Sequence, residues 1–428
     1  MQDANHQDAN HTADAYDHSP DEVETRHELE HHLRKGRLSG LTVQGLALDG
    51  SDGGDGGAPP DLSRAEVKDT LFVGCRFADP ATGADLIRRG AHVVPDFHEM
   101  LYSTHPPRLY TPEDLVAGYD GGGFAGMYDT RVHWHFVARG GALPDVREAL
   151  AQRMHDHAID DALTDTMDAW AAASGGPVVG VMGGHAEPRG SAGYRLAARI
   201  GQRLAAAGCL VVTGGGPGVM EAANLGAAFS GSEADALLGV IDQLAEAPRF
   251  ADHDPYTEKA LDVRRAHTAP GLPRAESPGS GEAALAWARH GGLSAPTWLY
   301  GHEPANLFAA RVAKYFSNAI REDTILQLAR GGIVFAAGRA GTVQEVFQAA
   351  TKTFYATDGA SGPFVFLGTR YWTDSLPVEK LLRPLLAGSP HGDMSHLVHL
   401  VDDVDEAVAL LLRQAPPAAA KEAQRVTP

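Results

Sequence analysis

The chain has 428 residues and a mass of 45.2 kDa, which is two to three times the size of an average domain. Hydrophobic residues make up 43% and charged residues 21%, proportions that are typical of a soluble globular protein. Asp and Glu (55) outnumber Lys and Arg (36), which gives a formal net charge of -19. Because this charge repels phosphodiester backbones and anionic lipids, the composition predicts neither a nucleic-acid nor a membrane partner.

The number of cysteines and the composition of the first residues indicate the cellular compartment in which the protein is expected. Two cysteines, Cys75 and Cys209, are too few for a disulfide framework, and neither belongs to a CxxC pair. The acidic, His-rich first residues lack the apolar stretch of a signal peptide, and nowhere do 18 apolar residues run together as a transmembrane helix would need. We therefore expect a cytoplasmic protein.

The front of the chain predicts a small domain without a recognisable active site. Residues 1–24 contain QDANH twice and little that could be buried, so a disordered tail is predicted. Residues 25–165 hold strand-like segments such as DTLFVGCRF and helix-like segments such as PATGADLIRRGAH, which predicts a smaller N-terminal α/β domain. RVHWHF predicts a further strand with His133 and His135 on one face. We interpret both as surface residues, and no metal site is predicted.

A second domain is predicted over residues 166–415. GGPVVGVMGG and CLVVTGGGPG each hold a short apolar run that ends in glycines, the pattern of a strand buried on both faces of a parallel sheet. Between them, Leu196, Ile200 and Leu204 mark one face of a helix. The succession of strand, helix, strand, glycine turn and helix predicts a Rossmann-like, doubly wound parallel sheet.

The rest of this domain is predicted to continue the alternation after an interruption. A stretch rich in Pro, Gly and charge at about 228–290 is interpreted as an insertion. A helix is then predicted over NLFAARVAKYFSNAIREDTILQLA, followed by the strand GGIVFAA, the helix VQEVFQAATKTFYA, the strand PFVFLGTRYW and a closing strand and helix. Residues 416–428 are predicted to be a frayed tail.

Two loops in this domain share one design, a glycine-rich turn between a buried strand and a helix. The residues concerned are Gly214, Gly215, Gly216 and Gly218 in the first loop, and Gly338, Gly341 and Thr342 in the second. Glycine allows backbone amides to approach a ligand, and a helix N-terminus offers unpaired N–H groups with partial positive charge. The loops therefore predict a phosphate site at the carboxyl ends of parallel strands. Thr342 and Glu345 also fit a T-x-x-E capping box, so a purely structural role for Glu345 stays open.

The two loops carry a family resemblance. TGGGPGVMEAANLGA is similar to the first signature of the Lonely Guy (LOG) family, T/Y-GGG-x-G-x-M-x-A, and AAGRAGTVQE resembles a version of its second signature, PGGxGTxxE, that is one residue longer. The resemblance covers about residues 176–415 and is to the larger, bacterial branch. It implies a Rossmann-like homodimer or higher homo-oligomer that hydrolyses the N-glycosidic bond of a nucleoside 5′-monophosphate to free base and ribose 5-phosphate. No cofactor or metal is implied.

The resemblance also implies site residues. Arg321, ahead of the second motif, and Glu345, at its end, would be catalytic. Residues that would bind the phosphate or nucleotide are Gly183, Gly184, Gly214, Gly215, Gly216, Gly218, Glu221, Glu303, Gly338, Arg339, Gly341, Thr342 and Thr351. Ala336 and Ala337 stand where the family has Pro-Gly, and Glu322 follows Arg321 where the family has Lys. These departures leave the base specificity open.

Two other functions stay open at this point. A Rossmann-like protein could bind or sense a nucleotide without cleaving it, which the altered AAGRAG loop favours. A single-stranded DNA-processing protein could also use such a domain, although the net charge of -19 argues against it. For the expected subunit contact, the predicted helix around Ala310–Leu328 offers an apolar face that includes Val312, Ala313 and Phe316.

Overall fold

The structure is a computed structural model that describes residues 21–51, 58–97, 99–173, 176–267, 287–301 and 305–416. The chain forms two compact units, one of residues 1–109 and 143–168 and the other of residues 110–142 and 169–428. Among the described residues, no helix combines the length and the apolar composition that crossing a bilayer requires.

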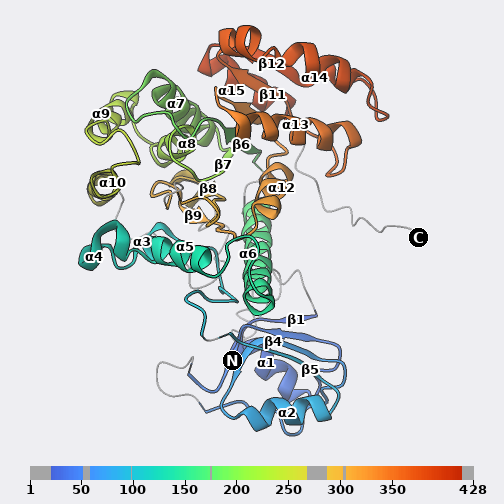
Figure 1. The fold of residues 1–428 in the computed structure, drawn as a ribbon. Helices are drawn as coiled ribbons and strands as arrows, with labels where there is room; N and C mark the ends of the chain where they lie inside the picture. Colours follow the sequence, from blue (N-terminus) through green and yellow to red (C-terminus); the bar gives the residue numbers. More distant parts are fainter. Residues whose placement is uncertain are drawn as a thin grey trace, which may run out of the picture. The chain divides into compact units, whose positions relative to one another are not determined.

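The first unit is built on a parallel sheet. Its strands are β1 (Glu22–Val23), β2 (Thr42–Gln44), β3 (Ala47–Leu48), β4 (Leu71–Phe77) and β5 (His92–Pro95), and its helices are α1 (Arg26–Arg34), α2 (Pro80–Arg88) and most of α6 (Val146–Ala173). Strands β1, β2, β4 and β5 pair in that order and in parallel (Figure 1). Because β1 pairs with β2, ordered structure begins before residue 25, where the predicted tail ends; residues 1–20 lie outside the described part.

The second unit contains a sheet of seven parallel strands in the order β12-β11-β10-β6-β7-β8-β9. They are β6 (Val178–Met182), β7 (Leu210–Thr213), β8 (Leu293–Ser294), β9 (Arg311–Val312), β10 (Ile333–Phe335), β11 (Phe364–Leu367) and β12 (Val398–Val401). Successive strands run outward from β6 on one side and from β10 on the other. This confirms the predicted Rossmann-like, doubly wound fold, and the ligand site of such sheets lies where the order reverses, between β6 and β10.

In the described part of this unit, three helices precede its first strand in the chain, and the others lie between or after the strands. The helices are α3 (Pro112–Val116), α4 (Tyr119–Gly126), α5 (Tyr128–Ala138), α7 (Ala192–Ala206), α8 (Val219–Ala228), α9 (Ala234–Leu244), α10 (His253–His267), α12 (Asn318–Leu328), α13 (Ala340–Tyr355), α14 (Val378–Ala387) and α15 (Val404–Gln414), with a π-helical turn at Tyr371–Ser375 and a 3-10 turn at Ser395–Leu397. The apolar runs predicted as strands are buried because helices cover the sheet.

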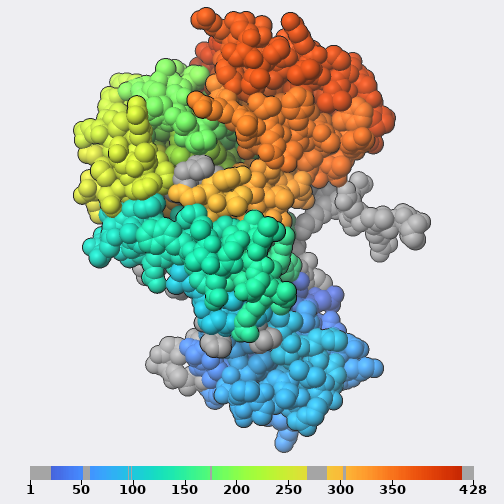
Figure 2. Space-filling view, in the orientation of Figure 1, coloured from blue at the N-terminus to red at the C-terminus, as the bar shows by residue number. Residues whose placement is uncertain are grey.

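Residues 110–142 belong to the second unit. From the sequence, by contrast, they are predicted to be part of the N-terminal domain over residues 25–165. Tyr110 forms an antiparallel bridge with Val312, in which each backbone N–H donates to the other residue's carbonyl at 3.0 and 2.8 Å. In the space-filling view this segment (teal) lies against the yellow-orange residues that follow β8 and β9 (Figure 2). The pairing joins residues far apart in the chain, which a local pattern cannot show.

RVHWHF is part of helix α5 and not a strand. The alternation of apolar and polar residues was misleading, because Val132 and Phe136 are four apart and both buried, whereas Trp134 is 53% exposed. His133 and His135 therefore do not share a face, and His133 Nδ1 lies 2.7 Å from the carbonyl oxygen of Trp298.

The helix predicted over residues 306–329 begins only at Asn318, where Ser317 is the N-cap and accepts from the Ile320 N–H. The preceding residues form β9 and an extended segment, in which Val312, Ala313 and Phe316 are buried within the unit. These three residues of the expected apolar face are core, whereas Ile320, Thr324 and Leu328 of the same predicted helix are half-buried on α12, and a homo-oligomer stays a prediction. The expected insertion is also more regular than predicted, since it contains α9 and α10; residues 268–286 lie outside the described part.

Helices α7 and α8 approach so closely that glycine is required at their contact. A Cβ on Gly201 would lie 2.0 Å from the carbonyl oxygen of Ala223, and one on Gly226 would lie 1.8 Å from that of Ala198. We expect Gly201→Ala to cost about 1–3 kcal/mol of unfolding free energy, because the helices must separate. The matched control is Gly239→Ala in α9, where nothing lies within 4 Å and the better helix propensity should add up to about 1 kcal/mol. Urea unfolding measures both; changes of the same sign would contradict the expectation.

Candidate functional site

Three loops meet at the carboxyl ends of the central strands. Gly183 and Gly184 follow β6, Gly214 begins the loop after β7, and Ala336 begins the loop after β10. The Gly184 N–H donates to the carbonyl of Ala337 at 3.1 Å, and the Gly184 carbonyl accepts from the Val219 N–H at 3.2 Å. The loop after β6 thus contacts both glycine loops. These loops therefore lie at one edge of the sheet, on either side of Gly184, as expected for a shared site.

The first glycine loop is buried, and its glycines are needed for packing. Gly214, Gly215, Gly216 and Gly218 are all buried. Gly215 and Gly218 have φ of 75° and 72°. A Cβ would lie 2.7 Å from Pro296 Cδ at Gly215 and 2.5 Å from the Gly184 carbonyl oxygen at Gly218. The absence of a Cβ at Gly215 and Gly218 thus allows close packing, and all four glycines are buried and do not line an open surface.

A buried amide network, which the sequence did not reveal, holds this loop. Thr213 Oγ1 accepts from the Gly215 N–H at 3.1 Å and donates to Asn224 Oδ1 at 2.6 Å. Asn306 Nδ2 donates to the same Asn224 oxygen at 2.8 Å, and Asn224 Nδ2 donates to the Gly291 carbonyl at 2.5 Å. The available signal was Asn224, which together with Glu221 interrupts the otherwise apolar sequence of α8.

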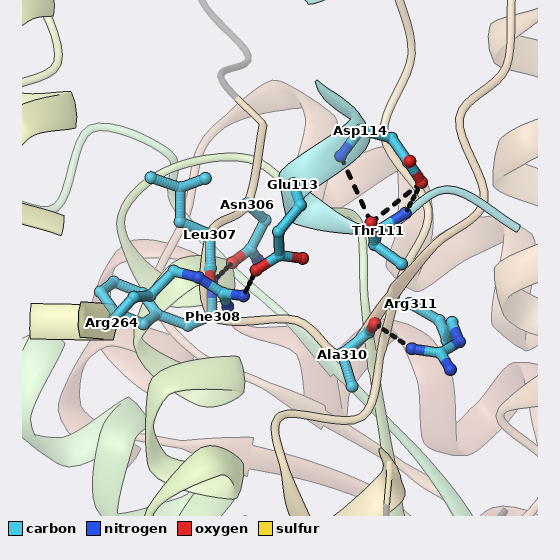
Figure 3. Close-up of polar contacts among 9 residues, drawn as sticks. All are labelled: Thr111, Glu113, Asp114, Arg264, Asn306, Leu307, Phe308, Ala310 and Arg311. Atoms are coloured by element: carbon cyan, nitrogen blue, oxygen red, sulfur yellow. Dashed lines mark hydrogen bonds and ion pairs between the residues drawn. The ribbon is translucent and has the colours of Figure 1, made fainter. Parts of the chain in front are cut away.

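Asn306 is itself held in place by its surroundings (Figure 3). Its Oδ1 accepts from the Phe308 N–H at 3.1 Å. Arg264 of α10 bonds to the neighbouring Leu307 carbonyl and to Glu113 of α3, so the segment after residue 305 is anchored from two helices (Figure 3). The network therefore connects the first glycine loop to the segment 110–142.

The second glycine loop is open and ends at the N-terminus of α13. Arg339 is the N-cap residue with extended backbone and no side-chain cap, and Arg339 and Gly341 are exposed. The Val343 N–H donates to the Arg339 carbonyl, so the earlier amides of the turn have no intrahelical acceptor. Gly338 is required because a Cβ there would lie 2.1 Å from Oγ1 of the buried Thr342. This helix end has the form of an anion site.

Tyr371 supports this loop and was not predicted from the sequence. Its hydroxyl donates to the Gly338 carbonyl from the π-helical turn Tyr371–Ser375. The bond occupies the carbonyl that precedes the helix end and fixes the loop between β10 and α13. Nothing in the local pattern around PFVFLGTRYW distinguished this tyrosine from a core aromatic residue.

Glu345 does not cap its helix. Because α13 begins at Ala340 with Arg339 as N-cap, Thr342 and Glu345 both lie inside the helix and the capping-box interpretation is wrong. Glu345 instead faces Arg321 of α12, whose Nη1 lies 4.0 Å from Glu345 Oε1. A Cβ on Gly214 would lie 3.2 Å from the same Nη1. The structure thus brings the two predicted catalytic residues together beside the first glycine loop, with side chains 7% and 14% exposed.

Glu221, predicted to bind the nucleotide, has its carboxylate occupied by donors from within the protein. Its carboxylate accepts from Arg189 Nε and Nη2 at 2.8 Å each, from the Tyr194 hydroxyl at 2.7 Å and from the Tyr256 hydroxyl at 2.8 Å. Burial raises its pKa, but Arg189 and the two hydroxyls outweigh burial and hold the pKa below its usual value. The four donors satisfy both oxygens, so Glu221 stabilises the fold.

Thr351, another predicted binding residue, does not join this site. Thr351 is exposed on α13, where its hydroxyl donates to the Phe347 carbonyl of the same helix at 2.8 Å. It lies six positions after Glu345, which places it on another side of the helix. Glu303 lies outside the described residues.

Sequence comparison gives one family match. The model of the SLOG cluster4 family matches residues 176–246. This stretch runs from β6 to α9 and includes the first glycine loop, whereas Arg321 and Glu345 lie beyond it. The SLOG superfamily includes LOG-like Rossmann-like proteins. The chain is therefore similar to a group that contains both enzymes and binding proteins. No curated protein matches the chain.

Among solved structures, the chain is similar to molybdenum cofactor proteins. The carrier protein from Chlamydomonas reinhardtii is 21% identical, with 56% of this chain and 99% of that chain covered and a TM-score of 0.31. The cofactor-binding protein from Rippkaea orientalis is 17% identical, with 56% and 96% covered and a TM-score of 0.29. TM-scores this low do not indicate a shared ligand. The Rossmann-like fold is assigned from the strand order of the sheet.

Proposed function

We propose that the second unit hydrolyses the N-glycosidic bond of a nucleoside 5′-monophosphate and releases the free base and ribose 5-phosphate. The observation that carries the proposal is the Arg321–Glu345 pair, 4.0 Å apart beside the open N-terminus of α13. The pair lies at the carboxyl edge where the strand order reverses, which is where open α/β sheets bind ligands. The family match over residues 176–246 supports a Rossmann-like nucleotide-binding protein.

In this proposal the phosphate binds at the second glycine loop. The first-turn amides of α13 donate to phosphate oxygens, and the helix dipole favours the negative charge. Arg339 is exposed at the N-cap and can add a charge-assisted hydrogen bond. The buried first loop then acts as the wall that holds Arg321 in place, since Gly214 leaves room for its Nη1.

The chemical step follows from the carboxylate. The C1′–N bond breaks and its electron pair goes to the base nitrogen, so positive charge develops on the ribose ring. Glu345 stabilises that charge and accepts a proton from the water whose oxygen bonds to C1′, and the leaving base takes up one proton from solvent, which gives the free base and ribose 5-phosphate. Arg321 offers only hydrogen-bond donors, and its role here is to orient the carboxylate.

The alternative is a protein that binds a nucleotide without cleaving it. Two observations favour it: the first glycine loop is buried, and Ala336, which is also buried, and Ala337 stand where the LOG-type motif has Pro-Gly. Binding alone would need the α13 helix end but not Glu345.

The experiment incubates the full chain separately with AMP, CMP, GMP and UMP and separates the products by chromatography. We expect at least one monophosphate to yield equal amounts of free base and ribose 5-phosphate, while the corresponding nucleoside, without a phosphate, is cleaved far more slowly. Calorimetry on the same nucleotides measures binding. Binding without release of base would replace the hydrolase by the binding function.

A further inference from the structure

Arg321 is held by a chain of side chains that continues away from the site. Its Nη2 donates to Asn318 Oδ1 at 2.7 Å, and Asn318 Nδ2 donates to Glu322 Oε1 at 2.8 Å. Glu322 Oε2 accepts from Gln344 Nε2 at 2.7 Å and from Gln348 Nε2 at 3.3 Å. Arg321 and Glu322 are only 5% and 8% exposed, whereas Asn318 and Gln348 are half-buried and Gln344 is exposed, so the two charged groups form the buried part of this chain of contacts.

The donors and acceptors of these side chains allow only one orientation of the Asn318 amide. A guanidinium only donates hydrogen bonds and an ionised carboxylate only accepts them. Asn318, between Arg321 and Glu322, must therefore turn its oxygen to the arginine and its NH2 to the glutamate. The charge of Glu322 thereby fixes the amide that holds Arg321.

The same carboxylate also ties the two helices of the site together. Arg321 and Glu322 lie on α12, whereas Gln344 and Gln348 lie on α13 on either side of Glu345. Contacts from Glu322 to α13 therefore set the distance between the helix that carries Arg321 and the helix that carries Glu345.

We propose that Glu322 and Asn318 are positioning residues for the Arg321–Glu345 pair. They touch no substrate; they hold the guanidinium against the catalytic carboxylate. This inference rests on the proposed hydrolysis. A displacement of about 1 Å between reacting groups can cost about 100-fold in rate, so loss of this chain should lower kcat more than it raises KM.

The test is Glu322→Gln, measured as kcat and KM for the best monophosphate together with Tm. Asn318 and Gln344 donate to different oxygens of Glu322, so in this geometry a Gln would present its NH2 group to one of the two donors and lose that hydrogen bond. We expect kcat to fall about 10- to 100-fold with KM changed less than about threefold. If this variant does not fold, Asn318→Ala removes the same series of hydrogen bonds at a half-buried position. It should give the same fall in kcat with little change in KM.

A second variant tests rescue. In the double variant Glu322→Gln, Gln344→Glu, the amide accepts from Asn318 and donates to the new carboxylate, and the total charge is unchanged. We expect it to recover most of the lost kcat. The matched control is Asp323→Asn, which removes the Lys352–Asp323 ion pair (2.7 Å) that also joins α12 to α13 without reaching Arg321. Its kcat should stay within about twofold of wild type.

Three results would overturn the inference while hydrolysis stands: Glu322→Gln within about twofold of wild-type kcat, a double variant as slow as the single one, or Asp323→Asn as slow as Glu322→Gln. A wild-type chain that releases no base from any monophosphate would instead refute the hydrolysis, and the positioning roles would fall with it. The two failures are distinguished by wild-type turnover, which is measured first.

Discussion

Glu345→Gln should lower kcat for the best nucleoside monophosphate by about 100- to 1,000-fold, with KM and Tm nearly unchanged. The amide keeps the size of the side chain but removes the negative charge that stabilises the developing positive charge on the ribose. Folding should be little affected because Glu345 lies inside α13 and does not cap it. Substrate affinity should persist because the amides at the start of α13 are untouched.

Arg321→Lys should also reduce kcat, since an ammonium group keeps the charge but cannot contact Glu345 and Asn318 with a planar fork. The matched control is Glu379→Gln on α14, whose carboxylate pairs with Arg383 at 2.7 Å on the surface. It makes the same chemical change and should leave kcat unchanged. A folded Glu345→Gln protein that turns over within about threefold of wild type would end the catalytic assignment and leave the nucleotide-binding alternative.

Glu221→Gln should cost the second unit about 3–5 kcal/mol of unfolding free energy, because it leaves the guanidinium of Arg189 buried without its counter-charge. The Arg189 and Glu221 side chains are 1% and 4% exposed, so water cannot replace the lost contact. Urea unfolding followed by tryptophan fluorescence is a suitable measurement. All 5 tryptophans, Trp134, Trp170, Trp287, Trp298 and Trp372, belong to the second unit, so the signal reports on that unit.

The matched control for Glu221 is an ion pair on the surface of the same unit. Arg203 and Asp405 are 2.8 Å apart but 56% and 57% exposed. Asp405→Asn should change the unfolding free energy by less than about 0.5 kcal/mol, since water screens the pair. If Glu221→Gln cost no more than Asp405→Asn, the buried pair would not have the stabilising role assigned to it.

The sequence by itself determined the central strands of the second unit and the glycine loops that follow them. Continuous apolar runs bounded by glycine identified β6, β7 and β10, because a strand covered on both faces must be apolar at every position. The same runs located the glycine loops at strand ends, and strand–helix alternation predicted the doubly wound sheet. The motif resemblance then singled out Arg321 and Glu345, which the structure places 4.0 Å apart.

Only the tertiary structure showed which hydrogen-bond and ion-pair partners the residues of the motifs have. Glu221 looked like a site residue from its motif, yet Arg189, Tyr194 and Tyr256 satisfy its carboxylate from three other segments. Glu322 looked like a departure from a family motif, yet it receives hydrogen bonds from α13.

Residues 110–142 and the start of α12 also depended on contacts distant in the chain. Tyr110 pairs with Val312, and that pairing holds Val312 in an extended edge segment although its neighbours fit a helical pattern. Local patterns determine helix and strand because they depend on residues within a few positions of each other. Ion pairs, sheet edges and amide networks depend on distances between segments, which are set only when the chain folds.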